Sequence, residues 1–353
     1  MTDIEALDTP CVLIDLTKVE ANLARAQTYA DAHGLKLRPH IKTHKLVRFA
    51  RRQVELGAIG VTCQKLGEAE VMADGGIRDI FLPYNILGEL KLARLKALAQ
   101  RVQLSVTADS ATTVAGLAST FADAPRALDV LVECDTGMGR CGVQTPAEAL
   151  SLARTIAAAP GLSFAGLMTY PAAGQVGANI AWLNDAVALL TREGLAPRIV
   201  SNGGTPDLWR ADEVKAATEH RPGTYIYLDR YQVAKGVGAL EDCALSVLAT
   251  VVSRPTSNRA IIDAGSKSLT SDTLGLEGFG LVIEYPEAII SSLSEEHGSI
   301  DLTNCAAKPA VGERLRIIPN HACVVSNLFD RVALVNADGG VATQAVDARG
   351  RVD

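Results

Sequence analysis

The sequence predicts an α/β protein in two parts, a (β/α)8 TIM-like barrel and a C-terminal, mostly antiparallel β domain. Between about residues 37 and 228, short apolar runs alternate with longer Ala/Leu-rich segments of helical periodicity, which is typical of parallel βαβ units. After about residue 234, short apolar runs separated by turns replace this alternation. We therefore place the barrel at 12–234 and the β domain at 235–353, with 1–11 as a candidate addition to the β domain.

Eight apolar runs are the candidate barrel strands: Lys36–Ile41, Ala58–Thr62, Asp79–Leu82, Val102–Val106, Leu128–Glu133, Ser163–Thr169, Arg198–Ser201 and Thr224–Leu228. Helices are expected between them, over Thr43–Leu56, Lys65–Ala73, Leu87–Gln100, Ala111–Phe121, Thr145–Ala158, Ala178–Arg192 and Pro206–Ala217. Eight such units within about 200 residues match a closed barrel. A doubly wound open sheet is the alternative, but it usually carries a Gly-rich fingerprint after its first strand, and this sequence has no GxGxxG motif.

The β domain is expected to contain five strands, over Leu245–Ser253, Arg259–Asp263, Gly280–Ile283, Arg314–Ile318 and Arg331–Val335. The apolar run at Pro10–Ile14 precedes the barrel and either joins this domain or closes the barrel floor. A helix capped by Asp15 or Thr17 follows that run.

Composition excludes several classes of protein. The 353 residues are 48% hydrophobic and 21% charged, enough to bury a substantial core. A net charge of −6 argues against a nucleic-acid-binding protein. The sequence contains no run of about 18 apolar residues that could span a membrane and no basic, apolar start typical of a signal peptide. The seven cysteines, an odd number, predict reduced thiols and a cytoplasmic location.

Reacting groups in a (β/α)8 barrel lie at the carboxyl ends of its strands. The first predicted strand ends at Lys42. A lysine amine can form a Schiff base with a carbonyl compound when burial and neighbouring charges lower its pKa. Taken alone, a lysine in such a basic turn is more commonly a solvated surface residue. The choice between a reacting and a solvated Lys42 therefore depends on the residues at the other strand ends.

The seventh predicted strand ends in a small, hydroxyl-rich loop, Ser201–Thr205, that leads into a helix. Such a loop presents backbone N–H groups and a helix dipole to an anion, and barrels often bind phosphate after strands 7 and 8. A flexible Gly-Gly turn is the alternative. Arg221 and Gly223 add a cation and a position that permits close approach. A lysine and a phosphate site in one barrel mouth fit pyridoxal 5′-phosphate.

Several motifs together resemble the D-threonine aldolase and D-serine dehydratase family of alanine racemase-like (fold-type III) pyridoxal-phosphate enzymes. The first is the lysine motif at Pro39–Lys45, and the second is the Asp-Thr-Gly-Met segment at Asp135–Gly142. Similar segments occur at Thr62–Ala69, Ser201–Pro206, Glu219–Tyr225, Asp263–Lys267, Ser294–Gly298 and Pro319–Cys323. The resemblance covers nearly the whole chain and implies the barrel and the C-terminal β domain.

The resemblance also implies roles for individual residues. Lys42 would form the Schiff base with the cofactor, and Arg140 would approach its phenolic oxygen. Arg221 would lie at the pyridine nitrogen or have a structural role near the phosphate. Tyr170 or Tyr225 would contact the ring or the phosphate. The implied phosphate-binding residues are Ser201, Gly203, Gly204, Thr205, Gly223 and Thr224.

His321 and Cys323 form a second candidate site. If this segment is a strand, residues two apart share one face, so both side chains could hold a divalent metal. Imidazole and thiolate favour zinc, whereas manganese and magnesium prefer oxygen ligands. Without the resemblance, a core cysteine beside a surface histidine explains the pair. With it, His321 and Cys323 are expected to be metal ligands and, like Lys42, catalytic residues.

The implied function is that of a lyase dependent on pyridoxal phosphate and a divalent metal, acting on small D-β-hydroxy amino acids. D-threonine aldolase activity, which yields glycine and an aldehyde, is preferred. The alternative is a D-serine or D-threonine dehydratase that releases a 2-oxo acid and ammonia, and Cys323 favours its ligand set. An amino-acid racemase and a non-catalytic cofactor carrier are weaker alternatives. The resemblance also implies a homodimer.

Overall fold

The structure is a computed structural model that describes residues 4–353. The chain divides into two compact units. The first, the β unit, comprises the described part of Met1–Arg25, Thr43–Lys45 and Thr224–Gly350. The second, the barrel unit, comprises Ala26–Lys42, Leu46–Gly223 and Arg351–Asp353. The predicted boundaries at 12–234 and 235–353 differ from this division and stay a prediction; residues 1–3 of the candidate addition lie outside the described residues.

The barrel unit is built around a parallel sheet that, within the described residues, has eight strands in the order β2-β9-β8-β7-β6-β5-β4-β3. Their bounds are β2 Lys36–Leu37, β3 Val61–Thr62, β4 Asp79–Leu82, β5 Gln103–Ala108, β6 Leu128–Cys134, β7 Leu162–Thr169, β8 Ile199–Asn202 and β9 Glu219–His220. A parallel bridge pairs His40 with Thr62, whose N–H donates to the Pro39 carbonyl at 2.8 Å. These contacts join the segment after β2 to β3, so the sheet closes on itself and the barrel prediction is confirmed.

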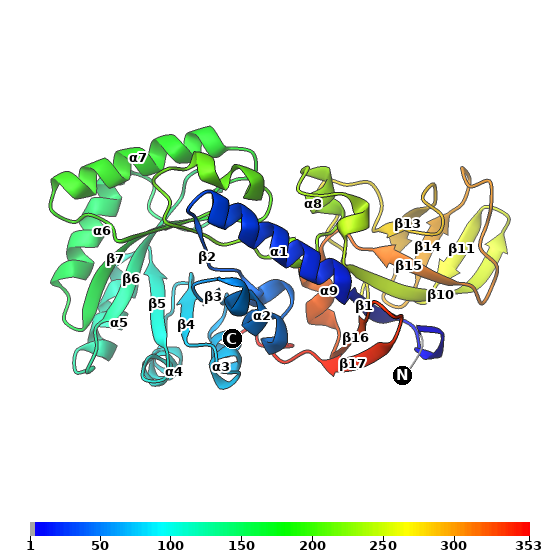
Figure 1. Cartoon of the computed structure of the whole chain (residues 1–353), viewed down its shortest axis with the longest axis horizontal. Helices are drawn as coiled ribbons and strands as arrows, with labels where there is room; N and C mark the ends of the chain where they lie inside the picture. The colour runs from blue at the N-terminus through cyan, green and yellow to red at the C-terminus, as the bar shows by residue number, and fades with distance from the viewer. Residues whose placement is uncertain (1–3) are drawn as a thin grey trace. The chain divides into compact units, whose positions relative to one another are not determined.

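Helices cover the outside of the barrel. They are α2 Val47–Leu56, α3 Leu66–Asp74, α4 Glu89–Ala99, α5 Ala111–Phe121, α6 Pro146–Ala158 and α7 Val176–Arg192. Figure 1 shows α4 to α7 around the outer side of β4 to β7. The start of α6 follows from its sequence, because Thr145 and Glu148 form a capping box and Pro146 occupies the first turn.

One predicted barrel helix is wrong. In place of a helix over Pro206–Ala217, the chain forms only the 3-10 helix η3, Leu208–Glu213. The side chain of Tyr29, on the helix α1 (Leu16–Ala32), explains part of the difference. Its hydroxyl accepts the backbone N–H of Asp212 at 3.3 Å and donates to the Asp212 carboxylate at 2.7 Å. A side chain thus supplies a partner that a longer helix would have supplied from its own backbone.

The eighth barrel strand also lies elsewhere than predicted. It is β9, Glu219–His220, whereas the predicted strand at Thr224–Leu228 begins with the 3-10 helix η4, Thr224–Ile226. Pro222 has no N–H to continue the ladder, which ends the strand before it. As a result Arg221 follows the last strand instead of opening it. Within the ladder, Glu219 and His220 pair with Lys36 and Leu37 of β2.

The β unit contains a second sheet, of order β11-β14-β13-β12-β15-β10-β1-β16-β17, and a further pairing of β10 with β11 closes six of its strands into a small barrel. The bounds are β1 Cys11–Asp15, β10 Leu245–Thr256, β11 Arg259–Ile262, β12 Leu281–Val282, β13 Ile289–Leu293, β14 Gly298–Asp301, β15 Arg314–Ile318, β16 Arg331–Val335 and β17 Val341–Ala345. Within this second sheet, as described for residues 4–353, only β1 and β16 pair in parallel among the named strands, so the prediction of a mostly antiparallel domain is confirmed. Of these strands, β13, β14 and β17 were not predicted.

The position of β1 decides between the two places predicted for the apolar run at Pro10–Ile14. β1 pairs antiparallel with β10, Cys11 opposite Leu248, and parallel with β16, Leu13 opposite Ala333. It therefore belongs to the β unit and does not close the barrel floor. The following helix α1 is capped by Asp15, whose Oδ1 accepts the N–H groups of Thr17 and Lys18.

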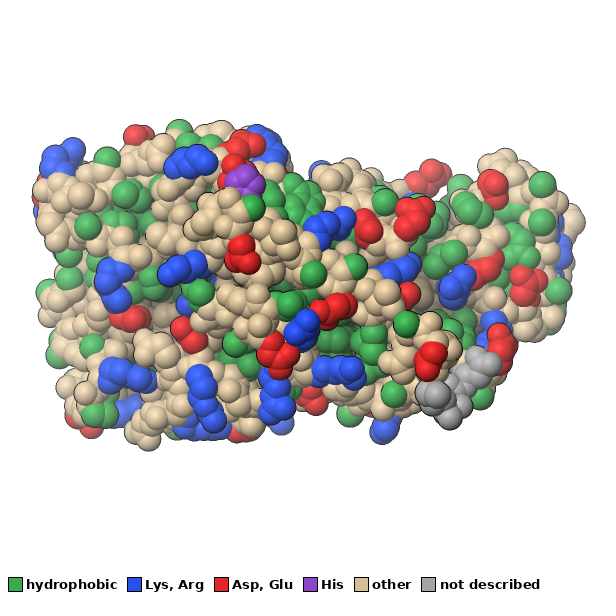
Figure 2. All heavy atoms as spheres, viewed as in Figure 1, with side chains coloured by type: hydrophobic (Ala, Val, Ile, Leu, Met, Phe, Trp, Pro, Cys, Tyr) green, Lys and Arg blue, Asp and Glu red, His purple; other side chains and the backbone are tan. Residues whose placement is uncertain are grey.

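Charged side chains of both signs lie on the surface of the described residues (Figure 2). On the face drawn in Figure 2, Lys and Arg side chains intermingle with Asp and Glu, and no large basic area stands out there. A helix long and apolar enough to cross a membrane is absent from residues 4–353.

Candidate active site

Lys42 lies on the carboxyl side of the first barrel segment, although β2 itself ends at Leu37 and not at Ile41 as predicted. It follows the ladder residue His40 by two positions and sits in the 3-10 helix η2, Ile41–Thr43. Its backbone N–H points to the His40 Nδ1 at 3.4 Å, and the residue is half-buried. This position is the one that a reacting lysine would take in a barrel.

The predicted phosphate loop is a buried turn with fixed contacts. β8 ends at Asn202, and the turn begins at Gly203, whose φ of 81° is a conformation that favours glycine. The Nε2 of His220 lies 2.9 Å from the Gly204 carbonyl oxygen. The N–H of Gly223 donates to the Thr205 Oγ1 at 3.0 Å. The structure thus brings together Gly203, Gly204, Thr205 and Gly223, four of the residues expected at the phosphate.

Ser201 differs from the other predicted phosphate residues because its hydroxyl contacts charged side chains inside the barrel. Its buried hydroxyl donates to the Glu219 Oε1 at 2.5 Å and accepts from the Arg221 guanidinium at 2.6 Å. The side chain therefore already has an acceptor and a donor inside the barrel. Its expected contact with a phosphate stays a prediction.

Ser201 is one link in a buried chain of charges that runs through the barrel. Arg221 also donates to the Thr169 carbonyl at 2.7 Å, and burial lowers the pKa of this guanidinium to about 10, so it stays charged at neutral pH. Glu219, the partner of Ser201, accepts from Arg38 at 2.9 Å. Arg38, whose side chain is only 7% exposed, pairs in turn with Asp79 at 2.6 Å. The alternation of signs keeps each buried charge compensated.

A second buried carboxylate was not assigned a role by the sequence. Glu133 is the penultimate residue of β6 and is only 5% exposed. Burial, with the nearby charge of Asp109, raises the pKa of Glu133 to about 7, although Arg140 and Arg221 oppose the shift. The signal available in the sequence was its position, an acidic residue at the carboxyl end of a barrel strand.

Arg140 and Tyr170 meet beside the phosphate loop. The Arg140 guanidinium lies 5.4 Å from the centre of the Tyr170 ring. The same ring covers Gly204, where an added Cβ would come within 2.6 Å of the ring carbon Cε2. Tyr225 is buried in η4 of the β unit, as is Thr224. The structure therefore supports Tyr170 as the tyrosine beside the loop, and roles for Thr224 and Tyr225 at the phosphate stay predictions.

The predicted metal pair does not lie on a strand. His321 is the cap residue before the helix α9, Ala322–Leu328, and Cys323 lies in its first turn. The reasoning from strand alternation was therefore wrong, because Ala322 already enters the helix. The two side chains nevertheless interact. Burial lowers the pKa of His321, but hydrogen bonding and charge from Cys323 and from the Asp272 carboxylate outweigh burial and raise it to about 9.

The surroundings of the pair suit a metal ligand set. The Nδ1 of His321 lies 3.1 Å from the Asp272 carboxylate, which leaves Nε2 as the ring nitrogen for a metal. Hydroxyls of Thr43 and Thr224 lie 3.1 Å and 3.5 Å from the Cys323 sulfur. A group of three or more His, Cys, Asp and Glu side chains able to hold a metal is absent from the described residues. A metal here would take two protein ligands, with water or substrate in its other positions.

Asp229 fixes the start of the helix that carries Cys323. Its buried carboxylate accepts the N–H of Gln232 in α8, Arg230–Ala234, and the N–H of Ala322 in α9, both at 2.9 Å. Burial raises the pKa of Asp229 to about 6. The Arg230 N–H donates to the Pro319 carbonyl at 3.1 Å, so the two segments are joined at more than one point. The sequence signal was an aspartate just before a short helix.

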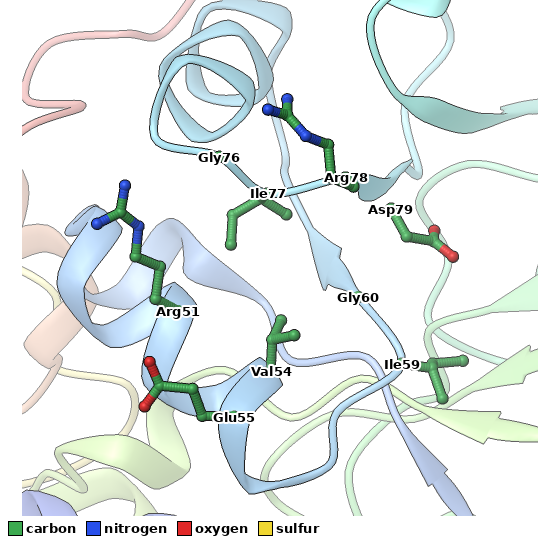
Figure 3. Close-up of a pocket in the computed structure, with 9 residues that line it drawn as sticks. All are labelled: Arg51, Val54, Glu55, Ile59, Gly60, Gly76, Ile77, Arg78 and Asp79. Carbon is green, nitrogen blue, oxygen red and sulfur yellow. The ribbon is translucent and has the colours of Figure 1, made fainter.

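A cavity of about 360 Å³ lies at the other end of the barrel. Figure 3 shows it between the end of α2 and the segments that enter β3 and β4, and its lining includes Val54, Ile59, Ile77 and Arg78. These residues precede the strands, so the cavity is at their amino-terminal end. Reacting groups of such barrels gather at the carboxyl end, and the cavity is therefore not part of the candidate active site.

Comparison with known proteins agrees with this geometry. Residues 14–231 match the family model "Alanine racemase, N-terminal domain", and residues 244–335 match the "Putative serine dehydratase domain". The chain is 36% identical to a D-threonine aldolase of Arthrobacter sp, over 95% of this chain and 90% of that protein. It is 33% identical to the D-threo-3-hydroxyaspartate dehydratase of Delftia sp. (strain HT23), over 96% of each.

Among solved structures, D-threonine aldolase from Filomicrobium marinum superposes with a TM-score of 0.91 at 31% identity, covering 99% of this chain and 97% of that one. The predicted resemblance is thereby confirmed. The strand-end lysine, the buried Gly-Gly turn and these matches together place the chain in the alanine racemase-like, fold-type III family of pyridoxal-phosphate enzymes, to which it belongs.

Proposed function

We propose that this protein is a pyridoxal-phosphate-dependent lyase that cleaves D-β-hydroxy amino acids, with the retro-aldol cleavage of D-threonine to glycine and acetaldehyde as its reaction. The observation that carries the proposal is a half-buried lysine after the first barrel segment, in a barrel that also holds the buried Gly203–Gly204 turn, the candidate phosphate loop. The 36% identity to a D-threonine aldolase over nearly the whole chain supports it.

The residues present fit the cofactor. The turn at Gly203 exists only because no side chain projects there, since an added Cβ would lie 2.0 Å from the His220 ring. Backbone N–H groups of such a turn can approach a phosphate closely. Lys42 would hold the cofactor covalently and deliver the proton that Cα gains when the Cα–Cβ bond breaks, whereas a base would take the proton of the β-hydroxyl, which becomes the aldehyde oxygen. Arg221 would keep a fixed positive charge in the barrel mouth. When bound, pyridoxal phosphate supplies an electron sink for bond cleavage at Cα.

In this proposal the β unit would supply the residues for a divalent metal. We assign His321 Nε2 and Cys323 Sγ as its ligands, and this donor pair favours zinc over manganese and magnesium. Asp272 would hold the imidazole in the tautomer that leaves Nε2 free of a proton. A bound cation would polarise the β-hydroxyl of the substrate, the group that distinguishes these substrates from simple amino acids.

A dehydratase is the second candidate function. It is favoured by the cysteine at position 323 and by the 33% identity to D-threo-3-hydroxyaspartate dehydratase. In this reaction the hydroxyl leaves, and the products are a 2-oxo acid and ammonia instead of glycine and an aldehyde. The same residues would serve both reactions, so the products decide between them.

The test is an incubation of the purified enzyme with D-threonine, followed by product analysis. Glycine with acetaldehyde supports the aldolase, and 2-oxobutyrate with ammonia supports the dehydratase. Formation of L-allo-threonine alone, the product of inversion at Cα, at a rate unchanged after exhaustive chelation, would indicate a racemase and refute both. If D-threonine and other D-β-hydroxy amino acids all remain unchanged while pyridoxal phosphate stays bound, the carrier alternative holds.

Two further expectations accompany the proposal. A homodimer is expected from the family, and light scattering of the purified protein measures it. A cytoplasmic location, expected from the cysteine content, is checked by fractionation of cells that express the chain.

A further inference from the structure

His220 has an unusual position for a residue of a two-residue strand. Its neighbour Glu219 joins the buried chain of charges, and successive strand residues point to opposite faces. The His220 ring lies against the Gly203–Gly204 turn instead. It is 2% exposed, and an added Cβ on Gly203 would lie 2.0 Å from its Cε1 and 2.3 Å from its Nδ1. The ring therefore fills the space beneath the turn.

The protonation of this ring is fixed by its partners. Nε2 lies 2.9 Å from the Gly204 carbonyl oxygen, which can only accept, so Nε2 carries the proton. Nδ1 is buried and has no hydrogen-bond partner among the described residues. Burial and the charge of Arg221 lower the pKa of His220 to about 4, although the bond to Gly204 opposes the shift, so the ring is neutral at pH 7.

The flanks of the turn are held separately. Asn179, in the first turn of α7, donates to the Asn202 side-chain oxygen at 3.0 Å. On the other side, the Gly223 N–H holds Thr205. These contacts fix where the loop starts and ends, whereas His220 contacts the Gly-Gly backbone itself. Two consecutive glycines have the largest freedom of any dipeptide, so this is the part of the loop that most needs a support.

We propose that His220 is a positioning residue for the cofactor phosphate: its ring and its Nε2–H hold the Gly203–Gly204 backbone in the conformation that presents N–H groups to the phosphate. The inference rests on the proposed use of pyridoxal phosphate and adds a residue to it. Its effect is confined to the phosphate end of the cofactor, because His220 contacts the loop and the loop contacts the phosphate.

The test compares two cofactors that differ only in the phosphate. The full chain is freed of cofactor, and the dissociation constants of pyridoxal phosphate and of pyridoxal are measured by absorbance titration. His220→Phe keeps a ring but removes the N–H, and we expect it to weaken pyridoxal phosphate about tenfold, the effect of one well-placed buried hydrogen bond. Pyridoxal affinity should change less than twofold. The phosphorus NMR signal of the bound cofactor should shift or broaden in the same variant.

His220→Gln is the rescue variant, because its side-chain amide nitrogen can take the place of Nε2 and donate to Gly204. It should restore most of the affinity for pyridoxal phosphate, and it also serves if His220→Phe does not fold. Gly203→Ala should reproduce the selective loss, since its Cβ would displace the ring. The loss should be smaller when the same change is made in a His220→Ala background, where the ring is gone.

The outcomes separate the inference from the function on which it rests. Equal weakening of both cofactors in His220→Phe, or no weakening of either, would overturn the role of His220 while the wild-type chain still binds pyridoxal phosphate. A wild-type chain that binds pyridoxal and pyridoxal phosphate equally weakly would instead overturn the proposed function.

Discussion

Glu133→Gln should remove a large pH dependence from the stability of the barrel unit. The carboxyl group is buried at the end of β6, and burial with the charge of Asp109 raises its pKa to about 7 from the ordinary 4.5. A raised folded-state pKa means that the folded protein binds the proton more tightly than the unfolded chain. The stability contributed by this group is therefore complete below about pH 4.5 and is lost as the pH rises through 7.

The magnitude follows from the two pKa values. Their difference corresponds to about 3 kcal/mol, because each pH unit between them changes the free energy of unfolding by about 1.4 kcal/mol. Since Glu133 is only 5% exposed, solvent screens little of this effect. Gln has a similar shape and no charge, so Glu133→Gln should be more stable than the wild type at pH 8 by about 3 kcal/mol and nearly equal to it at pH 4.5.

Tryptophan fluorescence is a suitable probe, because the two tryptophans of the chain, Trp182 and Trp209, both belong to the barrel unit. Urea unfolding of the cofactor-free protein is followed at pH 5 and pH 8 for the wild type and Glu133→Gln. Glu213→Gln is the matched control: it makes the same change on an exposed residue, whose pKa is lowered through its hydrogen bond with Arg210. The contribution of Glu213 is present above its ordinary pKa and lost only as the pH falls.

The control should therefore keep the wild-type difference between pH 5 and pH 8. If Glu133→Gln keeps it as well, Glu133 is not the group that titrates, and the reasoning from its burial fails. The reasoning also fails if Glu133→Gln is less stable than the wild type at pH 8.

Three further changes test other parts of the structure. Asp229→Asn should weaken metal binding at least tenfold in calorimetric titrations, because its two carboxylate oxygens accept at two helix starts and a neutral amide has only one oxygen. Asp15→Asn is the control: it makes the same change at the cap of α1, where one oxygen accepts both N–H groups, and should leave metal affinity unchanged. Cys323→Ser should bind zinc at least tenfold more weakly and lose activity in proportion, measured with the metal-free enzyme at fixed free zinc. Arg38→Met should lower the free energy of unfolding of the barrel unit in urea by about 3 to 5 kcal/mol, because it leaves the buried Glu219 without its Arg38 partner. The double variant Arg38→Met/Glu219→Gln should recover part of this loss. If the losses of the two single variants simply add in the double variant, the pairing is disproved.

Local pattern was enough for much of the fold. The predicted bounds of β4, α5, β15 and β16 agree with the structure, because each is a strongly apolar or periodic run bounded by turn residues or a cap. Ser110, for example, caps α5 by accepting the N–H of Thr113. The lysine at the first strand end and the Gly-Gly turn were found in the same way, because their residue types and their positions along the chain were visible.

The errors occurred where partners distant in sequence decide the structure. β9 has only two residues and exists because it lies between β2 and β8, with Glu219 held by Arg38 from 181 positions away. The hydroxyl of Ser201 lies between Glu219 and Arg221, two contacts that the loop sequence does not indicate, and its contact with a phosphate stays a prediction. His321 and Cys323 alternate like strand residues, but Asp229 accepts the N–H of the residue between them and starts a helix there. No local pattern contains that information.

The pairing of β1 has a consequence for how the chain is made. Its apolar residues Val12, Leu13 and Ile14 are buried between β10 and β16 in the finished protein. During synthesis β1 leaves the ribosome before its partner β10, and roughly 240 residues must follow β1 before β10 is complete. At about 5 to 20 residues per second this takes about 10 to 50 s, during which the whole barrel is translated. A nascent chain stopped before Leu245 would therefore carry an unpaired, apolar strand at its N-terminal end, the kind of edge on which chains aggregate and which chaperones bind.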